Sequence, residues 1–228
     1  EFSRKSALYK KLSFYIAPPW PYFETVSNRL GTYAKLASQN LSMLVSGTET
    51  GEVGLDIVKS FGVRLAILGH SERRTKGETS QNVSEKAKIA LRAGIVPLVC
   101  VGEQTRDSDG EYFEFLRDEL KSSLSGISPK SLSNVILAYE PIWAIGKTAK
   151  EAIQHDELAQ TVLFLRKVLT DLYGRKIAEK TPILYGGSVE PEDAGILMRG
   201  TGVQGFLVGH ASLKAKSLES IAKSLLSK

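Results

Sequence analysis

Residues 135–146 read Val-Ile-Leu-Ala-Tyr-Glu-Pro-Ile-Trp-Ala-Ile-Gly, an apolar run that leads into a single acidic residue. The first five residues predict a buried strand, and Glu140 stands at its carboxyl end. Pro141 stops the strand, Trp143 is a large apolar anchor and Gly146 supplies backbone freedom. A carboxylate at the base of such a loop is desolvated when the loop closes, which suits a general base. The segment is equally compatible with a glutamate that forms a salt bridge in a structural turn.

Strands and helices alternate along the rest of the chain. Short apolar runs predict strands at residues 13–17, 32–39, 64–68, 95–101, 134–139, 182–185 and 203–208. Amphipathic patterns predict helices at residues 80–93, 111–125, 150–173, 191–198 and 217–226. This alternation indicates βαβ units and a parallel sheet that is buried on both faces. No spacer rich in Pro, Gly or Ser divides the sequence, so we expect one α/β domain over residues 1–228.

Polar and glycine-rich residues follow one predicted strand after another. They are Gly69-His70, Gly102-Glu103, Glu140, Gly186-Gly187-Ser188 and Gly209-His210. No Gly-x-Gly-x-x-Gly follows the first strand, which weakens a dinucleotide-binding interpretation. Functional residues spread over many strand ends are typical of a (β/α)8 barrel.

Composition narrows the class of function. The 228 residues are 42% hydrophobic and 24% charged with a net charge of +5, as in ordinary globular proteins. The basic residues are spread out, and the densest stretch, residues 4–11, fits a solvated helix face better than a nucleic-acid site. Cys100 is the only cysteine and fits a small hydrophobe in a strand. With no long apolar run and no signal peptide, we expect no membrane association and a cytoplasmic location.

Residues 68–74, Leu-Gly-His-Ser-Glu-Arg-Arg, place His70 directly after a predicted strand. Ser71 fits a helix N-cap, and Glu72 would lie in the first turn, where negative charge is favourable. The positive potential of the helix N-terminus would keep the imidazole neutral and able to donate a hydrogen bond to a substrate oxygen. Alternatively, His70 is a capping residue and Glu72 pairs with an arginine on the helix surface. The presence of Glu140 favours the functional interpretation.

Two glycine-rich segments late in the chain fit the pattern of phosphate-binding turns. Gly186-Gly187-Ser188 and Gly209-His210 each follow a predicted strand. Exposed backbone N–H groups in such turns bind phosphate oxygens, and barrels often bind phosphate after strands 7 and 8. A tight turn is the usual use of one Gly-Gly pair, whereas two such segments at neighbouring strand ends favour phosphate.

Read together, these segments resemble the triosephosphate isomerase family. The resemblance runs in family order from about residue 13 to the C-terminus. Its most specific motifs are His70-Ser-Glu-Arg-Arg74 and Tyr139-Glu-Pro-Ile-Trp-Ala-Ile-Gly146. The other matches are Ser38-Gln-Asn40, Thr50-Gly-Glu52, Gly77-Glu78, Cys100-Val-Gly-Glu103, Tyr185-Gly-Gly-Ser188, Gly205-Phe-Leu-Val-Gly209 and Ala211-Ser-Leu-Lys214.

The resemblance implies a TIM barrel and an aldose–ketose isomerase that acts in glycolysis and gluconeogenesis. Such an enzyme interconverts dihydroxyacetone phosphate and D-glyceraldehyde 3-phosphate through an enediolate. Glu140 would move the proton, His70 would polarise the carbonyl oxygen, and Glu72 belongs to the same catalytic motif. The family needs no cofactor or metal, and its substrate is a small phosphorylated triose.

The resemblance also implies the remaining site residues. The hinge of a lid over the site would be formed by Pro141, Ile142 and Trp143. Phosphate would be bound mainly through the backbone of Gly146, Ser188, Gly209 and His210, with Gly186 and Gly187 in the same turn.

Four departures from the family pattern qualify these expectations. The family's first strand, which ends in Asn-x-Lys, has no match, so we expect the first strand and most of the first helix to be missing from residues 1–228. The lid after Gly146 is about two residues short, His210 replaces a glycine, and Glu49 replaces an apolar loop tip. Glu49 weakens the expectation of a homodimer and makes a monomer plausible.

Two explanations of the missing strand remain open. Either a working protein has an N-terminal piece outside this sequence, which we favour, or the barrel has an open edge and an impaired site. The alternative function is accordingly a catalytically impaired or non-enzymatic phosphate-binding barrel of the same family.

Overall fold

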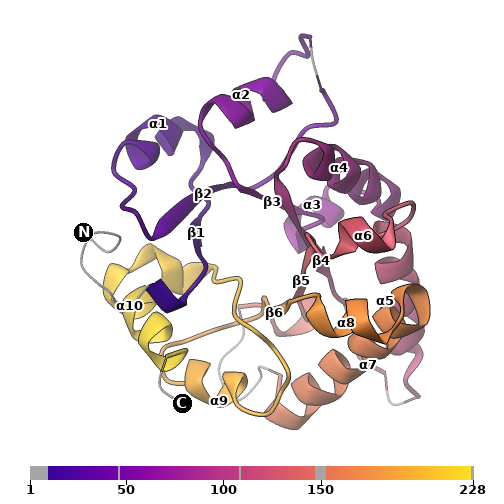
Figure 1. Ribbon diagram of the computed structural model, residues 1–228. Helices are drawn as coiled ribbons and strands as arrows, with labels where there is room; N and C mark the ends of the chain where they lie inside the picture. The colour runs from indigo at the N-terminus through magenta and orange to yellow at the C-terminus, as the bar shows by residue number, and fades with distance from the viewer. Residues whose placement is uncertain (1–9, 46, 108, 147–152, 227–228) are drawn as a thin grey trace.

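A computed structural model describes residues 10–45, 47–107, 109–146 and 153–226 of the chain. Six parallel strands form one curled sheet in which each strand pairs with the next along the chain. Helices lie around the outside of this sheet (Figure 1). The strands are β1 (Phe14–Ile16), β2 (Ala34–Ser38), β3 (Leu65–Leu68), β4 (Val96–Val101), β5 (Ile136–Tyr139) and β6 (Ile183–Tyr185).

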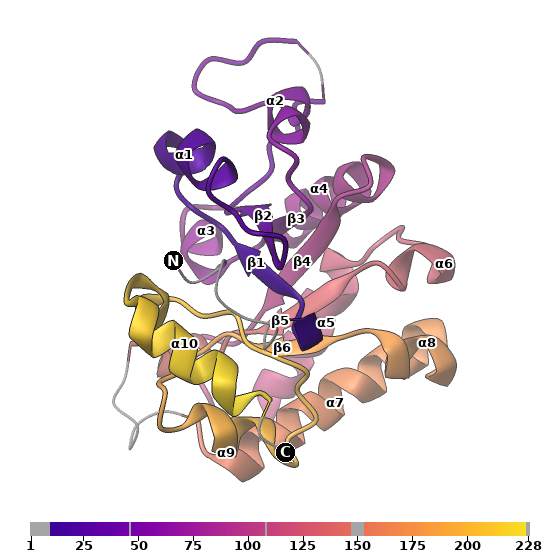
Figure 2. The ribbon, with the colours of Figure 1, turned by 60° about the vertical axis from the view of Figure 1, so that its left-hand side comes forward.

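The connections between strands carry the helices. Most of these helices are short, whereas α4, α5 and α7 are long. Helix α5 packs against both α4 and α7 on the outside of the sheet (Figures 1 and 2). The α-helices are α1 (Phe23–Ser27), α2 (Leu55–Ser60), α3 (Ser71–Thr75), α4 (Ser80–Arg92), α5 (Glu111–Ser123), α6 (Pro129–Leu132), α7 (His155–Tyr173), α8 (Arg175–Lys180), α9 (Ala194–Met198) and α10 (Ala215–Ser224). The 3-10 helices are η3 (Trp20–Tyr22), η4 (Ile142–Ala144) and η5 (His210–Leu213).

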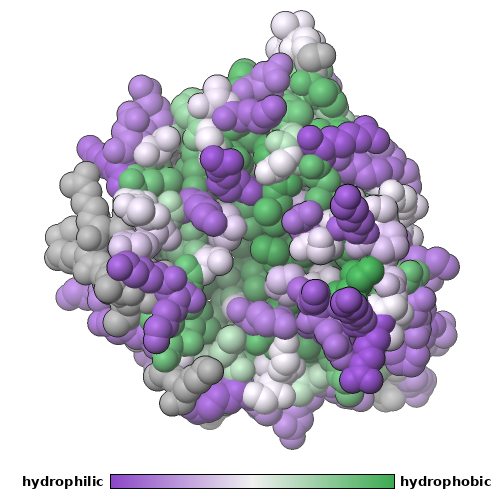
Figure 3. All heavy atoms as spheres, viewed as in Figure 1, coloured by the Kyte–Doolittle hydropathy of each residue, from purple (hydrophilic) through white to green (hydrophobic). Residues whose placement is uncertain are grey.

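Alternate side chains of each strand point to opposite faces of the sheet, so the strands bury apolar residues on both sides. The larger cluster lies between strands and helices and includes Leu36, Leu68 and Leu137. The smaller cluster, which includes Leu65 and Leu98, lies on the inner, concave face. Figure 3 shows apolar residues in the hollow that this inner face surrounds. The fold is therefore an α/β arrangement with a curled parallel sheet, which agrees with the predicted TIM-barrel class.

The predicted strand at residues 203–208 is only partly confirmed. The segment runs parallel to β6, and its amides and carbonyls alternate with those of β6: Gln204 N donates to Ile183 O at 2.9 Å, and Leu207 N donates to Tyr185 O at 2.9 Å. It is nevertheless a single bridge between Tyr185 and Phe206 and not a full strand. Among the described strands it pairs with β6 alone, so no second ladder extends it.

Three helices begin at other residues than predicted. The helix predicted from residue 217 begins two residues earlier, at Ala215. The helix predicted from residue 191 begins at Ala194, because residues 191–193 form a turn. The helix predicted from residue 150 begins at His155 within the described part of the chain, and residues 150–152 lie outside it. The remnant of a first helix, expected before residue 10, and the shortened lid after Gly146 also lie outside the described residues.

Candidate active site

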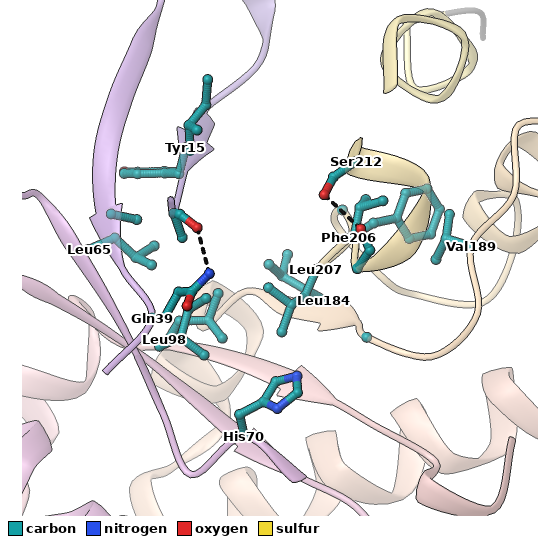
Figure 4. Close-up of a pocket in the computed structure, with 18 of the residues that line it drawn as sticks. Tyr15, Gln39, Leu65, His70, Leu98, Leu184, Val189, Phe206, Leu207 and Ser212 are labelled. Atoms are coloured by element: carbon teal, nitrogen blue, oxygen red, sulfur yellow. Dashed lines mark hydrogen bonds between the residues drawn. The ribbon is translucent and has the colours of Figure 1, made fainter. Parts of the chain in front are cut away.

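A cavity of about 1660 Å³ lies inside the curled sheet, and residues that follow the carboxyl ends of β3, β5 and β6 form part of its lining. Nine of the residues proposed from the sequence line it: His70, Glu72, Glu140, Gly146, Gly186, Gly187, Ser188, Gly209 and His210. Figure 4 shows the His70 ring pointing into this space, with Gln39, Leu184 and Leu207 around it. The fold therefore brings these nine residues together from four separate regions of the sequence. The hinge residues Pro141, Ile142 and Trp143 do not line the cavity but follow Glu140 directly.

Glu140 stands at the end of β5 with its side chain only 2% exposed. Oε2 accepts a hydrogen bond from the Ser71 amide at 3.0 Å. Oε1 lies 3.1 Å from His70 Nε2, but the geometry is not that of a hydrogen bond, so Oε1 has no hydrogen-bond partner within the described residues. Burial raises the pKa of Glu140 to about 7, against the opposing effect of the Ser71 amide. A carboxylate with one unpaired oxygen and a pKa near neutrality has the properties of a general base.

His70 is held as a neutral ring with a defined tautomer. Burial lowers its pKa below the ordinary value, while the charge of Glu72 acts in the other direction. Nδ1 accepts a hydrogen bond from the Glu72 amide at 3.3 Å, so the ring proton is on Nε2. This N–H is the one that faces the cavity and Glu140. The ring can therefore donate a hydrogen bond to an oxygen atom bound between the two residues.

The predicted N-cap of α3 was assigned to the wrong residue. His70, and not Ser71, caps the helix, since its ring nitrogen takes the amide of Glu72. Ser71 is the first residue of the helix, and its amide points at Glu140 instead. The capping role that the sequence offered as the alternative for His70 is therefore present in the structure, and its functional role stays a prediction. The sequence suggested Ser71 as the cap because a glutamate follows it. Nothing in the local sequence indicated that the Ser71 amide would donate to Glu140, which is 69 positions away.

Two glycines allow the chain to close tightly around Glu140. A Cβ atom on Gly102 would lie 1.7 Å from the backbone oxygen of Glu140. A Cβ atom on Gly186 would lie 2.9 Å from Glu140 Cγ. Both contacts are too short for any side chain, so only glycine fits where β4 and β6 end beside β5. These glycines fix the position of Glu140 from both sides.

The turn after β6 is connected to the segment that follows Glu140. Ser188 Oγ accepts a hydrogen bond from the Gly146 amide at 3.0 Å and donates one to Ala144 O at 3.2 Å. The two proposed phosphate-binding positions Gly146 and Ser188 are therefore in direct contact. For phosphate to use both groups, the hydrogen bond between them must be exchanged for bonds to the ligand.

The second glycine-rich turn leads into η5. Ser212 donates two hydrogen bonds to Gly209 O. One comes from its amide at 3.0 Å and the other from its hydroxyl at 2.6 Å, which Figure 4 shows as a dashed line. His210 is exposed beside this turn and lines the cavity. Gly187 has no room for a side chain, because a Cβ atom would lie 2.3 Å from the Tyr185 hydroxyl. The turns are thus shaped by close packing as well as by backbone hydrogen bonds.

The residues of the proposed hinge are anchored to the end of β4. Glu103 Oε1 accepts hydrogen bonds from Trp143 Nε1 at 2.8 Å, from the Tyr139 hydroxyl at 2.8 Å and from Arg106 Nε at 3.1 Å. Arg106 also lies 5.1 Å from the centre of the Trp143 ring. The buried Glu103 carboxylate therefore fixes the indole that follows Glu140.

Sequence reasoning did not identify several groups that shape the site. The Ser71 amide, the Cys100 thiol and the Arg74 guanidinium all lower the pKa of Glu140. Cys100 was interpreted as a small hydrophobe; it is fully buried, and burial raises its own pKa well above the ordinary value. The motif at residues 70–74 was the only signal that could have pointed to Arg74.

Within the described ranges, no group of three or more His, Cys, Asp and Glu side chains is arranged to hold a metal ion. In the same part of the chain, no helix combines the length and the apolar character needed to cross a membrane.

Comparison with known proteins identifies the family. The family model described as triosephosphate isomerase matches residues 1–225. Proteins named triosephosphate isomerase from Alkaliphilus oremlandii and Citrifermentans bemidjiense are 40% and 41% identical to this chain. The matches cover 84% and 91% of this chain and 77% and 83% of those proteins. The one from Dictyostelium discoideum is 35% identical over 96% of this chain and 85% of that protein. The chain belongs to the triosephosphate isomerase family of enzymes.

Proposed function

We propose that this protein interconverts dihydroxyacetone phosphate and D-glyceraldehyde 3-phosphate by proton transfer through an enediolate. The observation that supports it most strongly is the pairing of a buried glutamate, whose pKa burial raises to about 7, with a neutral imidazole 3.1 Å away. A base whose pKa lies near the working pH is ionised often enough to act and basic enough to remove a carbon-bound proton.

The two side chains have complementary roles in the proposed reaction. The Glu140 carboxylate takes a proton from the hydroxymethyl carbon of dihydroxyacetone phosphate. The electron pair of the broken C–H bond moves to the carbonyl oxygen, where the Nε2–H of His70 stabilises the developing charge. The hydroxyl proton on the first carbon then passes through the His70 imidazole to the former carbonyl oxygen, and Glu140 returns the carbon-bound proton to the neighbouring carbon, which gives the aldehyde. Protons and electrons balance within the substrate and the two side chains, without an external oxidant.

The phosphate group would lie against the two glycine-rich turns. Gly186, Gly187 and Ser188 line one part of the cavity mouth and Gly209 and His210 the other. Backbone amides in such turns suit phosphate oxygens. The His210 side chain lines the cavity beside these turns, where its ring N–H can donate a hydrogen bond to a phosphate oxygen.

A coupled assay on purified protein, with and without the Glu140→Gln substitution, tests the proposal. Removing a general base reduces kcat by roughly 10²- to 10⁴-fold, and we expect a loss of that size. The control is Glu114→Gln on α5, whose side chain is 78% exposed, and which should leave turnover unchanged. If wild-type protein binds a phosphate ligand but shows no more turnover than Glu140→Gln, the non-enzymatic phosphate-binding function replaces this one.

A further inference from the structure

Glu119 is a buried carboxylate that has no part in the proposed reaction. It lies on the inner face of α5 beside Leu116 and Leu120, and its side chain is 8% exposed. A charged group in such a place is unfavourable unless it is paired and hydrogen-bonded. Its contacts therefore show what it stabilises.

Both carboxylate oxygens of Glu119 have partners, and these partners lie beside the candidate active site. Oε2 accepts a hydrogen bond from the Gly102 amide at 2.8 Å. Oε1 lies 3.3 Å from Arg74 Nη1. Arg74 in turn donates from Nε to Gly69 O at 2.8 Å and from Nη2 to Cys100 O at 3.0 Å. The Arg74–Glu119 ion pair thus holds the carboxyl ends of β3 and β4 together.

These backbone positions are next to the reacting groups. Gly69 immediately precedes His70 in the chain. Gly102 is packed against the backbone of Glu140 so closely that a Cβ atom would overlap its carbonyl oxygen. Any shift of the Gly102 amide is therefore transmitted to Glu140. Through Gly102, Glu119 acts on the position of the base without touching the cavity.

The ion pair also affects the charge around Glu140. His70 after β3 lies against Glu140, and Cys100 on β4, Arg74 on α3 and Glu119 on α5 act on its charge. On the β6 side, Gly186 presents only backbone. Arg74 lowers the pKa of Glu140 and Glu119 raises it, although burial has the larger effect. Without Glu119, the guanidinium charge would act on the base unopposed.

We propose that Glu119 is a positioning residue for the isomerase reaction: it holds the Gly102 amide against the backbone of Glu140, and its charge keeps Arg74 from converting Glu140 into a weak base. The inference rests on the proposed isomerase function. It concerns a residue remote from the substrate and assigns it both a geometric and an electrostatic effect.

Glu119→Gln separates the charge of this residue from its shape. The amide oxygen of glutamine still accepts from Gly102, while the negative charge next to Arg74 is lost. The pKa of Glu140 should fall by about half a unit or more, because an uncompensated positive charge favours the carboxylate. A weaker base removes a carbon-bound proton more slowly, so kcat at pH 8 should fall by roughly 2- to 10-fold with KM nearly unchanged.

The midpoint of the Glu140 titration can be measured directly, with or without turnover. Protein labelled with ¹³C at the glutamate carboxyl carbons is titrated by NMR, and the signal missing in Glu140→Gln identifies the residue. Glu114→Gln removes the same charge from the exposed face of α5 and should leave the midpoint where it is. An unchanged midpoint in Glu119→Gln would overturn the electrostatic part of the proposal.

Glu119→Asp tests the geometric part and covers the case in which the glutamine variant does not fold. It keeps the charge but is one methylene too short to reach both Gly102 and Arg74. The Glu140 midpoint should stay near the wild-type value while kcat falls. An unchanged kcat in this variant would overturn the positioning role. If the wild-type protein has no turnover at all, the isomerase function fails, and the titration still shows whether Glu119 acts on Glu140.

Discussion

Burial gives the carboxyl group of Glu140 a property that an exposed glutamate lacks, which is a pKa near neutrality. The same burial makes the ionised form unfavourable for the fold. The group has an ordinary pKa of 4.5 and a value of about 7 in the folded chain. Its contribution to stability is fully present below pH 4.5 and is lost as the pH rises toward and through 7, because the unfolded chain ionises first.

Glu140→Gln should therefore be more stable than the wild type at alkaline pH. The difference in the free energy of unfolding should be near zero around pH 4.5 and should grow to roughly 3 kcal/mol above pH 7. Urea unfolding of both proteins between pH 5 and 8 measures it. A difference that does not change with pH would show that the carboxyl group titrates normally in the folded protein.

For individual residues, the sequence predicted that Glu140 and His70 lie together, but it did not predict all of their contacts. Glu140 and His70 were identified because each follows an apolar run that ends in a distinct polar residue. Glu119 gave no such signal, since one glutamate among the charged residues of an amphipathic helix looks like a solvated position. Its burial depends on Arg74 and Gly102, which are distant in sequence and close only after folding.

Among the secondary-structure elements, the ends of β4 and β5 lie closer together than any side chain allows. Gly102→Ala should force them apart, because its Cβ atom would meet the Glu140 carbonyl oxygen at 1.7 Å. Overpacking of this kind destabilises by roughly 1–3 kcal/mol or more, and we expect a loss at the upper end with a large fall in kcat. Thermal unfolding and the coupled assay measure both effects.

Gly54→Ala is the matched control for this substitution. Gly54 has a φ of −67° and precedes α2, and its added Cβ atom would lie 3.6 Å from Leu44. Alanine fits there, so the free energy of unfolding should change little. Equal losses in the two variants would indicate that the alanine side chain, and not the contact with Glu140, causes the effect.

The order and type of most elements could be predicted, because each follows from local periodicity. The strand predicted at residues 203–208 is reduced to a single bridge in the structure. The reason does not lie in the local sequence. A strand is defined by its partners, and this segment forms its described ladder with β6 on one side only. The start of α9 was also missed, since a proline at residue 191 fits a turn as well as a first helical turn.

For the molecule as a whole, the curled sheet surrounds a cavity larger than a triose phosphate fills. Ligand sites commonly occupy roughly 300–1,000 Å³, and this cavity has about 1660 Å³. The site occupies its polar mouth, whereas the inner part is lined by apolar side chains such as Leu65, Ile67 and Leu98. The barrel class was predictable from chemistry at many strand ends, but the curvature depends on long-range pairing that no segment encodes alone.

Self-association is a property of the whole molecule, and we expect one loop to limit it. The loop between β2 and α2 presents exposed Glu49 together with exposed Met43 and Val45. A partner that covered the apolar pair would have to desolvate the carboxylate, which is unfavourable without a counter-charge. We expect light scattering to give the mass of one chain at micromolar concentration, and Glu49→Phe to shift it toward a dimer. A dimer mass that does not change on dilution would refute this expectation.

The central claim, that Glu140 moves a proton through an enediolate, is tested most directly by isomerisation in D₂O. The proton held by Glu140 exchanges with solvent, so glyceraldehyde 3-phosphate formed from protiated dihydroxyacetone phosphate should carry deuterium at the carbon next to the aldehyde. Glu140→Gln should remain folded and lose product formation and exchange together, each by roughly 10²- to 10⁴-fold. Wild-type product that never contains solvent deuterium, or isomerisation by Glu140→Gln at the wild-type rate, would contradict the account.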